Sequence, residues 1–290
     1  MFIRKNILYL FIFLPLFTLD IEAYAKDMQE EVIYFGVIPR YNPVIMYRSY
    51  QPMMDYLSAN TDYRFELKLS RNYQQAVELL CEGKTRFASL GDVTFIEAHQ
   101  EFNAVPILKP LNRNGEPFYH SIIIVPEDSP IKDVKDLVGK SFAFGDPSST
   151  SGTLIPRTYL CEQGIHFPEM ESVTHLESHD AVAKAVLKGN VDAGAVKDVV
   201  ARRYQQHGLR FLVQSGPIPA VPIVTRRDTP AGLVNAVKAA LLKIDPSDPH
   251  TQQMLQQWDA EFSHGFVPAE LDHYEMIFDL MKNYPEGCEY

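Results

Sequence analysis

The chain has 290 residues, and its 27 Lys and Arg against 37 Asp and Glu give a formal net charge of −10. This acidic balance argues against general binding to nucleic acids or anionic membranes, although a few aimed donors can still bind a small anion. The three cysteines, Cys81, Cys161 and Cys288, lack the spacing of a zinc site or of a disulfide framework. Cys81 and Cys161 fit apolar helix positions, and one disulfide is the alternative in an oxidising compartment.

The first residues have the pattern of a cleavable export signal. Arg4 and Lys5 precede a short apolar stretch at 7–19, and a small-x-small cleavage pattern follows at 23–25. The apolar stretch is shorter than the roughly 20 residues that a membrane span needs. The sequence therefore predicts a signal peptide at 1–25 and a periplasmic mature chain, with an uncleaved membrane anchor as the alternative.

Short apolar strands alternate with amphipathic helices along the rest of the chain. Strands are predicted at 32–38, 65–69, 87–90, 121–125 and 141–144, and helices at 48–60, 73–81, 134–137, 154–162 and 233–244. This alternation is typical of α/β folds in which helices cover both faces of a parallel sheet. The chain is expected to cross between two lobes near 117–121 and near 217–225, and the second of these segments is rich in proline.

Two stretches of the chain, 72–92 and 178–198, share one order of features at the same spacing. Each begins with a polar residue and a ring residue, continues with an apolar helix, a glycine and a short strand, and ends at an aspartate. The repeat predicts that Tyr73 and His179 occupy equivalent places in two similar lobes. Because ligands in open α/β sheets bind at the carboxyl ends of strands, we expect both residues in one cleft.

A hydroxyl-rich loop follows the strand at 141–144. It contains Ser149, Thr150 and Ser151, and Pro156 indicates that the next helix begins near Thr153, since proline fits only the first turn. Free backbone N–H groups and the positive end of the helix dipole favour an anion there, and hydroxyls add donors without adding charge. Capping of the helix is the alternative role, although a cap needs one hydroxyl rather than a row of them.

The sequence Gly-Asp-Pro-Ser-Ser-Thr-Ser-Gly at 145–152 resembles the signature of the phosphate/phosphite/phosphonate-binding proteins of ABC importers. Further matches lie at 35–39, 117–121, 178–182, 189–193 and 217–219. The resemblance implies a two-lobed periplasmic-binding-protein fold of the type II kind, an α/β fold with a mostly parallel sheet in each lobe and two crossover hinge strands. We expect lobe 1 to comprise 26–118 and 222–290, and lobe 2 to comprise 119–221.

The same resemblance implies which side chains contact the ligand. They comprise three hydroxyl donors to the oxyanion, one histidine that contacts the same group, and two tyrosines that close the pocket: Ser149, Thr150, Ser151, His179, Tyr73 and Tyr119.

Two positions depart from the family pattern. Relatives that bind an aminoalkyl phosphonate hold its ammonium with carboxylates, and the matching positions here are Val199 and Val221. Because an apolar site cannot pair a buried ammonium, we expect no preference for an amino group. Loss of the acid also disfavours plain phosphate or phosphite, and an apolar substituent is one solution. Lys197 and Asp198 either add local polarity or are solvated.

The sequence has no Gly-x-Ser-x-Gly elbow, Walker loop or His-Glu-x-x-His motif, so we expect neither catalytic residues nor a cofactor. The predicted function is capture of a phosphonate- or phosphate-like oxyanion for an ABC permease by a monomer that does not bind nucleic acid. One alternative is a sensory protein that presents its ligand to a membrane receptor. Another is a ferric-iron-binding protein that uses Tyr73, Tyr119 and His179.

Overall fold

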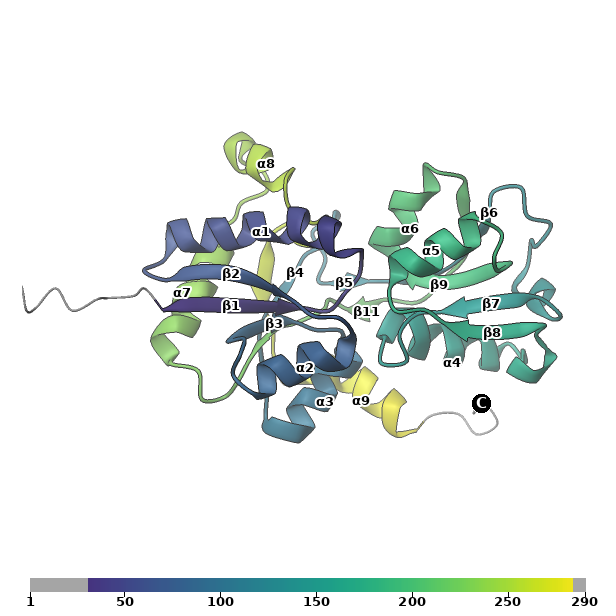
Figure 1. Cartoon of the computed structure of the whole chain (residues 1–290), viewed down its shortest axis with the longest axis horizontal. Coiled ribbons are helices and arrows are strands. Elements are labelled where there is room, and N and C mark those ends of the chain that lie inside the picture. The colour runs from purple at the N-terminus through teal and green to yellow at the C-terminus, as the bar shows by residue number, and fades with distance from the viewer. Residues whose placement is uncertain (1–30, 284–290) are drawn as a thin grey trace, which may run out of the picture. The chain divides into compact units, whose positions relative to one another are not determined.

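The structure is a computed structural model that describes residues 31–283 (Figure 1). The expected signal peptide at 1–25 and Cys288 lie outside these residues. Within residues 31–283, no helix is both long enough and apolar enough to cross a membrane. Cys81 is a free thiol, whereas Cys161 is disulfide-bonded and is therefore not a simple apolar helix residue.

The first lobe is built on a six-stranded sheet with the strand order β13-β4-β12-β3-β1-β2. Its strands are β1 (Val32–Val37), β2 (Arg64–Leu69), β3 (Phe87–Ser89), β4 (Val105–Pro110), β12 (Ile223–Thr225) and β13 (Phe266–Pro268). β1 pairs in parallel with β2 and β3, whereas β12 and β13 run antiparallel to their neighbours. Segments from both halves of the chain therefore share this sheet.

The helices of the first lobe are α1 (Pro43–Asn60), α2 (Tyr73–Cys81), α3 (Asp92–Phe102), α7 (Ala231–Leu242), α8 (Pro249–Leu255), η5 (Leu271–Tyr274) and α9 (Glu275–Lys282). α1 begins earlier than the predicted 48–60. The Asn42 side chain accepts hydrogen bonds from two backbone N–H groups of the first turn, and Pro43 is the first helical residue. Because Val44 and Tyr47 are exposed, apolar periodicity did not reveal this turn.

The second lobe has a five-stranded sheet with the strand order β10-β6-β9-β7-β8. Its strands are β6 (Ser121–Pro126), β7 (Ser141–Phe144), β8 (Ser172–His175), β9 (Ala193–Lys197) and β10 (Leu209–Gln214). Its helical segments are η2 (Val134–Leu137), η3 (Thr150–Leu154), α4 (Ile155–Glu162), η4 (Phe167–Glu169), α5 (His179–Leu187) and α6 (Asp198–Gln205). A Cβ at Gly194 would lie 2.6 Å from Val182 Cγ1, so this glycine lets α5 pack directly on β9.

The two lobes are joined by β5 (Phe118–Tyr119) and β11 (Ile218–Pro219), which pair antiparallel in a small sheet of their own (Figure 1). The predicted two-lobed α/β fold is confirmed, with mixed sheets where mostly parallel sheets were expected. Each lobe has its own aromatic core: Phe35 and Phe87 are fully buried in the first lobe, and Phe142 and Phe144 are nearly so in the second.

The internal repeat is present in three dimensions. α2 and α5 have nine residues each, and they are capped by the side chains of Asn72 and Ser178. Gly83 and Gly189 follow the helices with φ values of 70° and 69°, a left-handed conformation that favours glycine. A strand and a further helix follow in both cases. Tyr73 and His179 are consequently the first residues of equivalent helices.

Candidate ligand-binding site

The predicted site residues lie where strands end and helices begin, and the structure brings them together. All have side chains that are at most 5% exposed: Tyr73, Tyr119, Ser149, Thr150, Ser151 and His179. We call this set the hydroxyl cluster. Tyr73 begins α2 of the first lobe and His179 begins α5 of the second, so the cluster contains residues of both lobes.

The loop at the centre of the hydroxyl cluster is itself helical. η3 is a π-helical turn that continues into α4, whereas a regular helix was expected to begin only near Thr153. Ser149 is the N-cap, and its Oγ accepts a hydrogen bond from the Gly152 N–H at 3.0 Å. The Thr153 hydroxyl donates to the Asp146 carbonyl at 2.8 Å. Capping therefore explains Ser149 and not the hydroxyls of Thr150 and Ser151.

Gly152 allows the loop to approach the start of α5 closely. A Cβ at this position would lie 2.8 Å from Ser149 Oγ, 3.0 Å from His179 Cε1 and 3.2 Å from Gly145 Cα. Any side chain here would push the histidine away from the loop. The glycine therefore allows the loop and His179 to lie close together.

His179 is positioned as a neutral hydrogen-bond donor. Its Nδ1 lies 3.3 Å from the backbone N–H of Lys197 and accepts from it, so the ring proton resides on Nε2, 3.5 Å from the Tyr73 hydroxyl. Burial, followed by the positive charges of Lys197 and Arg40, lowers the pKa of His179 to about 3. The imidazole is therefore uncharged near neutral pH, and Nε2–H can donate to an anion.

The two tyrosines are also held in their protonated form. Burial raises the pKa of Tyr73 to about 12, against a hydrogen bond with Ser149 that lowers it. Burial and the neighbouring Asp92 carboxylate raise the pKa of Tyr119 well above its usual range, against hydrogen bonds with Thr150 and Ser151. Both phenols therefore act as neutral donors near neutral pH.

Asp92 adjoins the hydroxyl cluster, although no sequence motif marked it. It is the first residue of α3, and its Oδ2 accepts a hydrogen bond from the Tyr119 hydroxyl at 2.9 Å. The next residue, Val93, donates its backbone N–H to Thr150 Oγ1 at 3.1 Å. The start of α3 is therefore in direct contact with the hydroxyl cluster. The repeat offered a signal, because Asp92 ends the first repeat where Asp198 ends the second.

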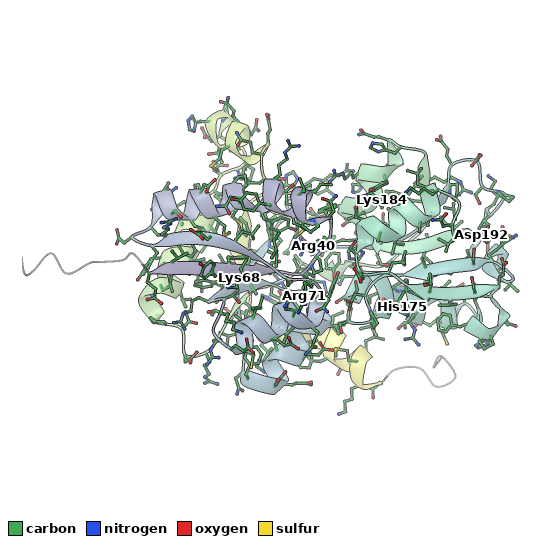
Figure 2. The ribbon with its side chains drawn as sticks, viewed as in Figure 1. Arg40, Lys68, Arg71, His175, Lys184 and Asp192 are labelled. Carbon is green, nitrogen blue, oxygen red and sulfur yellow. The ribbon has the colours of Figure 1, made fainter. Side chains whose placement is uncertain are left out.

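A buried charge network adjoins the hydroxyl cluster. The Lys197 ammonium lies 3.8 Å from the centre of the Tyr119 ring and pairs with the Glu261 carboxylate. Arg40, near the boundary of the lobes in Figure 2, pairs with the same carboxylate. The alternative that Lys197 and Asp198 are solvated is wrong, since they are 2% and 5% exposed. No sequence signal linked Arg40 with Glu261, because they lie far apart in the chain.

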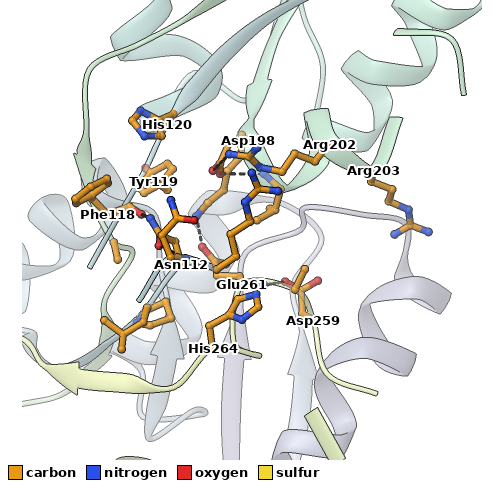
Figure 3. Close-up of a pocket in the computed structure, with 18 of the residues that line it drawn as sticks. Asn112, Phe118, Tyr119, His120, Asp198, Arg202, Arg203, Asp259, Glu261 and His264 are labelled. Carbon is orange, nitrogen blue, oxygen red and sulfur yellow. Dashed lines mark hydrogen bonds and ion pairs between the residues drawn. The ribbon is translucent and has the colours of Figure 1, made fainter. Parts of the chain in front are cut away.

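A cleft of about 650 Å³ opens beside this network (Figure 3). We call it the side cleft, and its lining includes Tyr119, Lys197, Asp198, Val199, Asp259 and Glu261. Its carboxylates all face cations of the chain. Asp198 Oδ2 lies 3.5 Å from Arg202, Glu261 pairs with Lys197, and the positive charges of Arg40 and Lys197 act on Asp259.

Val199 and Val221, which stand where relatives that bind an aminoalkyl phosphonate have carboxylates, both contribute apolar surface. Val199 is half-buried and lines the side cleft. Val221 is 2% exposed and packs in an apolar cluster that includes Tyr119 and Ile218. Among residues 31–283, no group of three or more His, Cys, Asp or Glu side chains gathers as a metal site would.

Comparison of the sequence with known proteins identifies its family and several relatives. A family model described as "ABC transporter, phosphonate, periplasmic substrate-binding protein" matches residues 35–274. The Phosphonates-binding periplasmic protein of Escherichia coli K12 is 26% identical over 224 residues, which are 73% of this chain and 65% of that protein. The Phosphate-import protein PhnD of Mycolicibacterium smegmatis is 29% identical over 180 residues, 59% of this chain and 56% of that protein. The matches thus cover less than two thirds of either relative.

Solved structures agree at the level of the fold. A binding protein component of an ABC phosphonate transporter from Pseudomonas aeruginosa has a TM-score of 0.77 at 23% identity, with 86% of this chain and 85% of that chain covered. PhnD1 from Prochlorococcus marinus, in complex with methylphosphonate, has a TM-score of 0.77 at 21% identity, with 88% and 98% covered. Because the family model matches most of its length, the chain belongs to the periplasmic substrate-binding proteins of phosphonate ABC transporters.

Proposed function

We propose that the protein captures a phosphonate- or phosphate-like oxyanion in the hydroxyl cluster and delivers it to an ABC permease. One observation carries the proposal: buried neutral donors converge from both lobes. The hydroxyls of Thr150 and Ser151, the Tyr73 phenol and His179 Nε2–H can each donate to an anionic oxygen. Hydrogen bonds to a charged group in a buried site are the strong kind.

The substituent on the oxyanion extends into the side cleft in this proposal. Tyr119 belongs to the hydroxyl cluster and also lines the side cleft, and Lys197 lies against its ring, so in this proposal the substituent extends past these two side chains. The valines at 199 and 221 offer no charge to an ammonium, and the carboxylates of the side cleft already face cations. An alkyl or polar uncharged substituent therefore fits better than an aminoalkyl group.

Binding by residues of both lobes supports a closing motion. Ligand contacts made only when the lobes approach would favour a closed form over an open form. In this proposal the lobes comprise 26–118 with 222–290, and 119–221, and β5 and β11 act as the hinge. The permease then receives the closed form, and the protein itself carries out no catalysis.

Iron binding is the competing use of the same residues. Ferric iron would be held by tyrosinates, whereas burial raises the pKa of both Tyr73 and Tyr119 and favours the protonated phenols. The protonated phenols therefore favour an oxyanion over ferric iron as the ligand. Metal analysis of the purified protein distinguishes the two: iron present in proportion to protein would support the competing use.

A thermal-shift screen followed by calorimetry tests the proposal. The ligands are methylphosphonate, ethylphosphonate, phosphate, phosphite, 2-aminoethylphosphonate and ferric citrate. We expect phosphonates to raise the melting temperature by mass action, with ethylphosphonate above 2-aminoethylphosphonate. No shift with any oxyanion would overturn the proposed function. A preference for 2-aminoethylphosphonate would overturn only the assignment of the substituent. Uptake of the preferred ligand by cells with and without the gene tests delivery.

A further inference from the structure

Asp92 has one carboxylate oxygen that is left without a partner. The side chain is fully buried at the start of α3. Its Oδ2 accepts from the Tyr119 hydroxyl, whereas its Oδ1 has no hydrogen-bond partner among residues 31–283. A buried carboxylate oxygen without a donor is unfavourable, and such groups in folded proteins are usually paired.

The equivalent aspartate of the second lobe, Asp198, has a partner for each of its carboxylate oxygens. Asp198 occupies the same place in the internal repeat, at the start of α6. Its Oδ1 accepts from the Val199 N–H at 2.9 Å, and its Oδ2 lies 3.5 Å from Arg202, four residues further along the helix. Four residues after Asp92 stands Ile96, which offers no charge. Asp92 of the first lobe therefore has a carboxylate oxygen without a partner among residues 31–283, whereas both carboxylate oxygens of Asp198 in the second lobe have partners.

Hydrogen bonds connect Asp92 and its neighbour Val93 to the hydroxyl cluster. Tyr119 bonds Asp92 and also Thr150 and Ser151, and Val93 donates to Thr150. We propose that Asp92 is a specificity-determining residue whose Oδ1 shares a proton with one oxygen of the bound ligand, which selects phosphonates and phosphates over sulfonates and sulfates. This inference rests on the proposed oxyanion function and names the class of oxyanion.

The physical basis is the basicity of the ligand oxygen. A carboxylate beside a fully deprotonated oxyanion is repelled unless a proton lies between them. A phosphonate or phosphate oxygen binds a proton near neutral pH, with a second pKa of roughly 6 to 7 as in phosphate monoesters. A sulfonate oxygen is far too weakly basic to share one. At a pH where the carboxyl is ionised in the free protein, it therefore stabilises the first class and penalises the second.

Charged and titratable groups from several elements face the Asp92 carboxyl. Burial raises the pKa of the Asp92 carboxyl, and the net value is about 7 because four nearby groups oppose the rise: Lys197 from β9, the Tyr119 phenol from β5, Arg40 after β1 and Lys109 from β4. Tyr274 from η5 faces it as an uncharged phenol. Above about pH 7 the free carboxyl is ionised, so binding of a phosphonate dianion must take up one proton.

Methylphosphonate and methanesulfonate provide the test, because they have nearly the same shape and differ in basicity. Calorimetry compares them on the wild-type protein and on Asp92→Asn. We expect wild type to favour methylphosphonate, and we expect Asp92→Asn to narrow that preference by roughly 10- to 100-fold, since the Asn amide can donate to either ligand. Asp192→Asn, at the far end of the second lobe in Figure 2, is the matched carboxyl-to-amide control and should leave the ratio unchanged.

A second measurement needs no variant. Titrations at about pH 9, where free methylphosphonate is a dianion and the free carboxyl is ionised, in buffers of different ionisation enthalpy should report uptake of close to one proton when wild type binds methylphosphonate, and the affinity should fall as the pH rises. In Asp92→Asn the uptake should disappear. Methylphosphonate binding without proton uptake, or an unchanged ligand ratio in Asp92→Asn, would overturn the role of Asp92 and leave the proposed function standing. Failure of wild type to bind any oxyanion would overturn the proposed function, and the role of Asp92 with it.

Discussion

The Lys197 ammonium and the Glu261 carboxylate form a buried ion pair that joins the two lobes. Lys197 ends β9 of the second lobe, and Glu261 lies between α8 and β13 of the first. Their side chains are 2% and 5% exposed, and Arg40 of the first lobe pairs with the same carboxylate. One carboxylate therefore pairs with two buried cations, one from each lobe, and links the lobes at this point.

Glu261→Gln should destabilise the protein more than Lys197→Met. The first change removes the carboxylate that pairs with both buried cations, and we expect a loss of about 3–5 kcal/mol in the free energy of unfolding. The second leaves Glu261 paired with Arg40, so the loss should be smaller. Chemical denaturation measures both. The exposed pair of Arg64 and Glu66 supplies a control, in which Arg64→Gln should change stability by about 0–1 kcal/mol. Equal effects of all three substitutions would contradict the shared role of Glu261.

Thr150→Val and Ser151→Ala should each weaken oxyanion binding. Each removes one buried hydroxyl that can donate to the ligand, and a lost hydrogen bond to a charged group corresponds to about 1.5–3 kcal/mol. Calorimetry with methylphosphonate measures the change. Ser148→Ala is the control, because it removes a hydroxyl from the same loop outside the hydroxyl cluster. Unchanged affinity in both test variants would show that the ligand binds elsewhere.

Gly152→Ala should impair binding because of space rather than backbone conformation. The added Cβ would stand 2.8 Å from Ser149 Oγ and 3.0 Å from His179 Cε1, so the histidine and the loop must separate. We expect at least a tenfold loss of oxyanion affinity, on the order of 1.4 kcal/mol, together with a lower melting temperature. Gly216→Ala is the control, since a Cβ there meets no atom within 4 Å. A Gly152→Ala protein with wild-type affinity would argue against the close approach.

His179 should contribute a loss of stability in acid. Its pKa is lowered to about 3 in the folded protein, by burial first and then by Lys197 and Arg40, so the unfolded chain binds a proton that the folded protein does not. Stability should therefore fall as the pH drops from about 6.5 towards 3, by at most about 1.4 kcal/mol per pH unit from this residue.

The variant His179→Gln isolates that contribution. Glutamine retains a donor and an acceptor but does not titrate. The free energy of unfolding of the variant should therefore depend less on pH between about 3 and 6.5 than that of wild type. Denaturation curves collected across this interval make the comparison. Parallel pH profiles for the two proteins would mean that the histidine does not titrate differently on folding.

Local patterns were enough to predict most secondary structure. The helix predicted at 73–81 coincides with α2, because Asn72 caps it, apolar residues recur at helical spacing and Gly83 ends it. The start of α1 was predicted too late. Its first turn is defined by Asn42 and Pro43, and exposed apolar residues in that turn break the helical spacing of the buried ones. Caps and glycines act within a few residues, so a sequence displays them directly.

The hydroxyl loop, the internal repeat and the family resemblance likewise pointed from the sequence to the six members of the hydroxyl cluster. Which charges meet beside them was decided only by the tertiary structure. Arg40, Lys197 and Glu261 come from three distant segments, and nothing in their local sequence indicates that they converge. Asp92 and Asp198 look alike in the repeat, yet in the folded chain an oxygen of Asp92 has no hydrogen-bond partner among residues 31–283, whereas Asp198 is paired. Burial and pairing depend on what other segments bring to a position, and that information is absent from any one stretch of the chain.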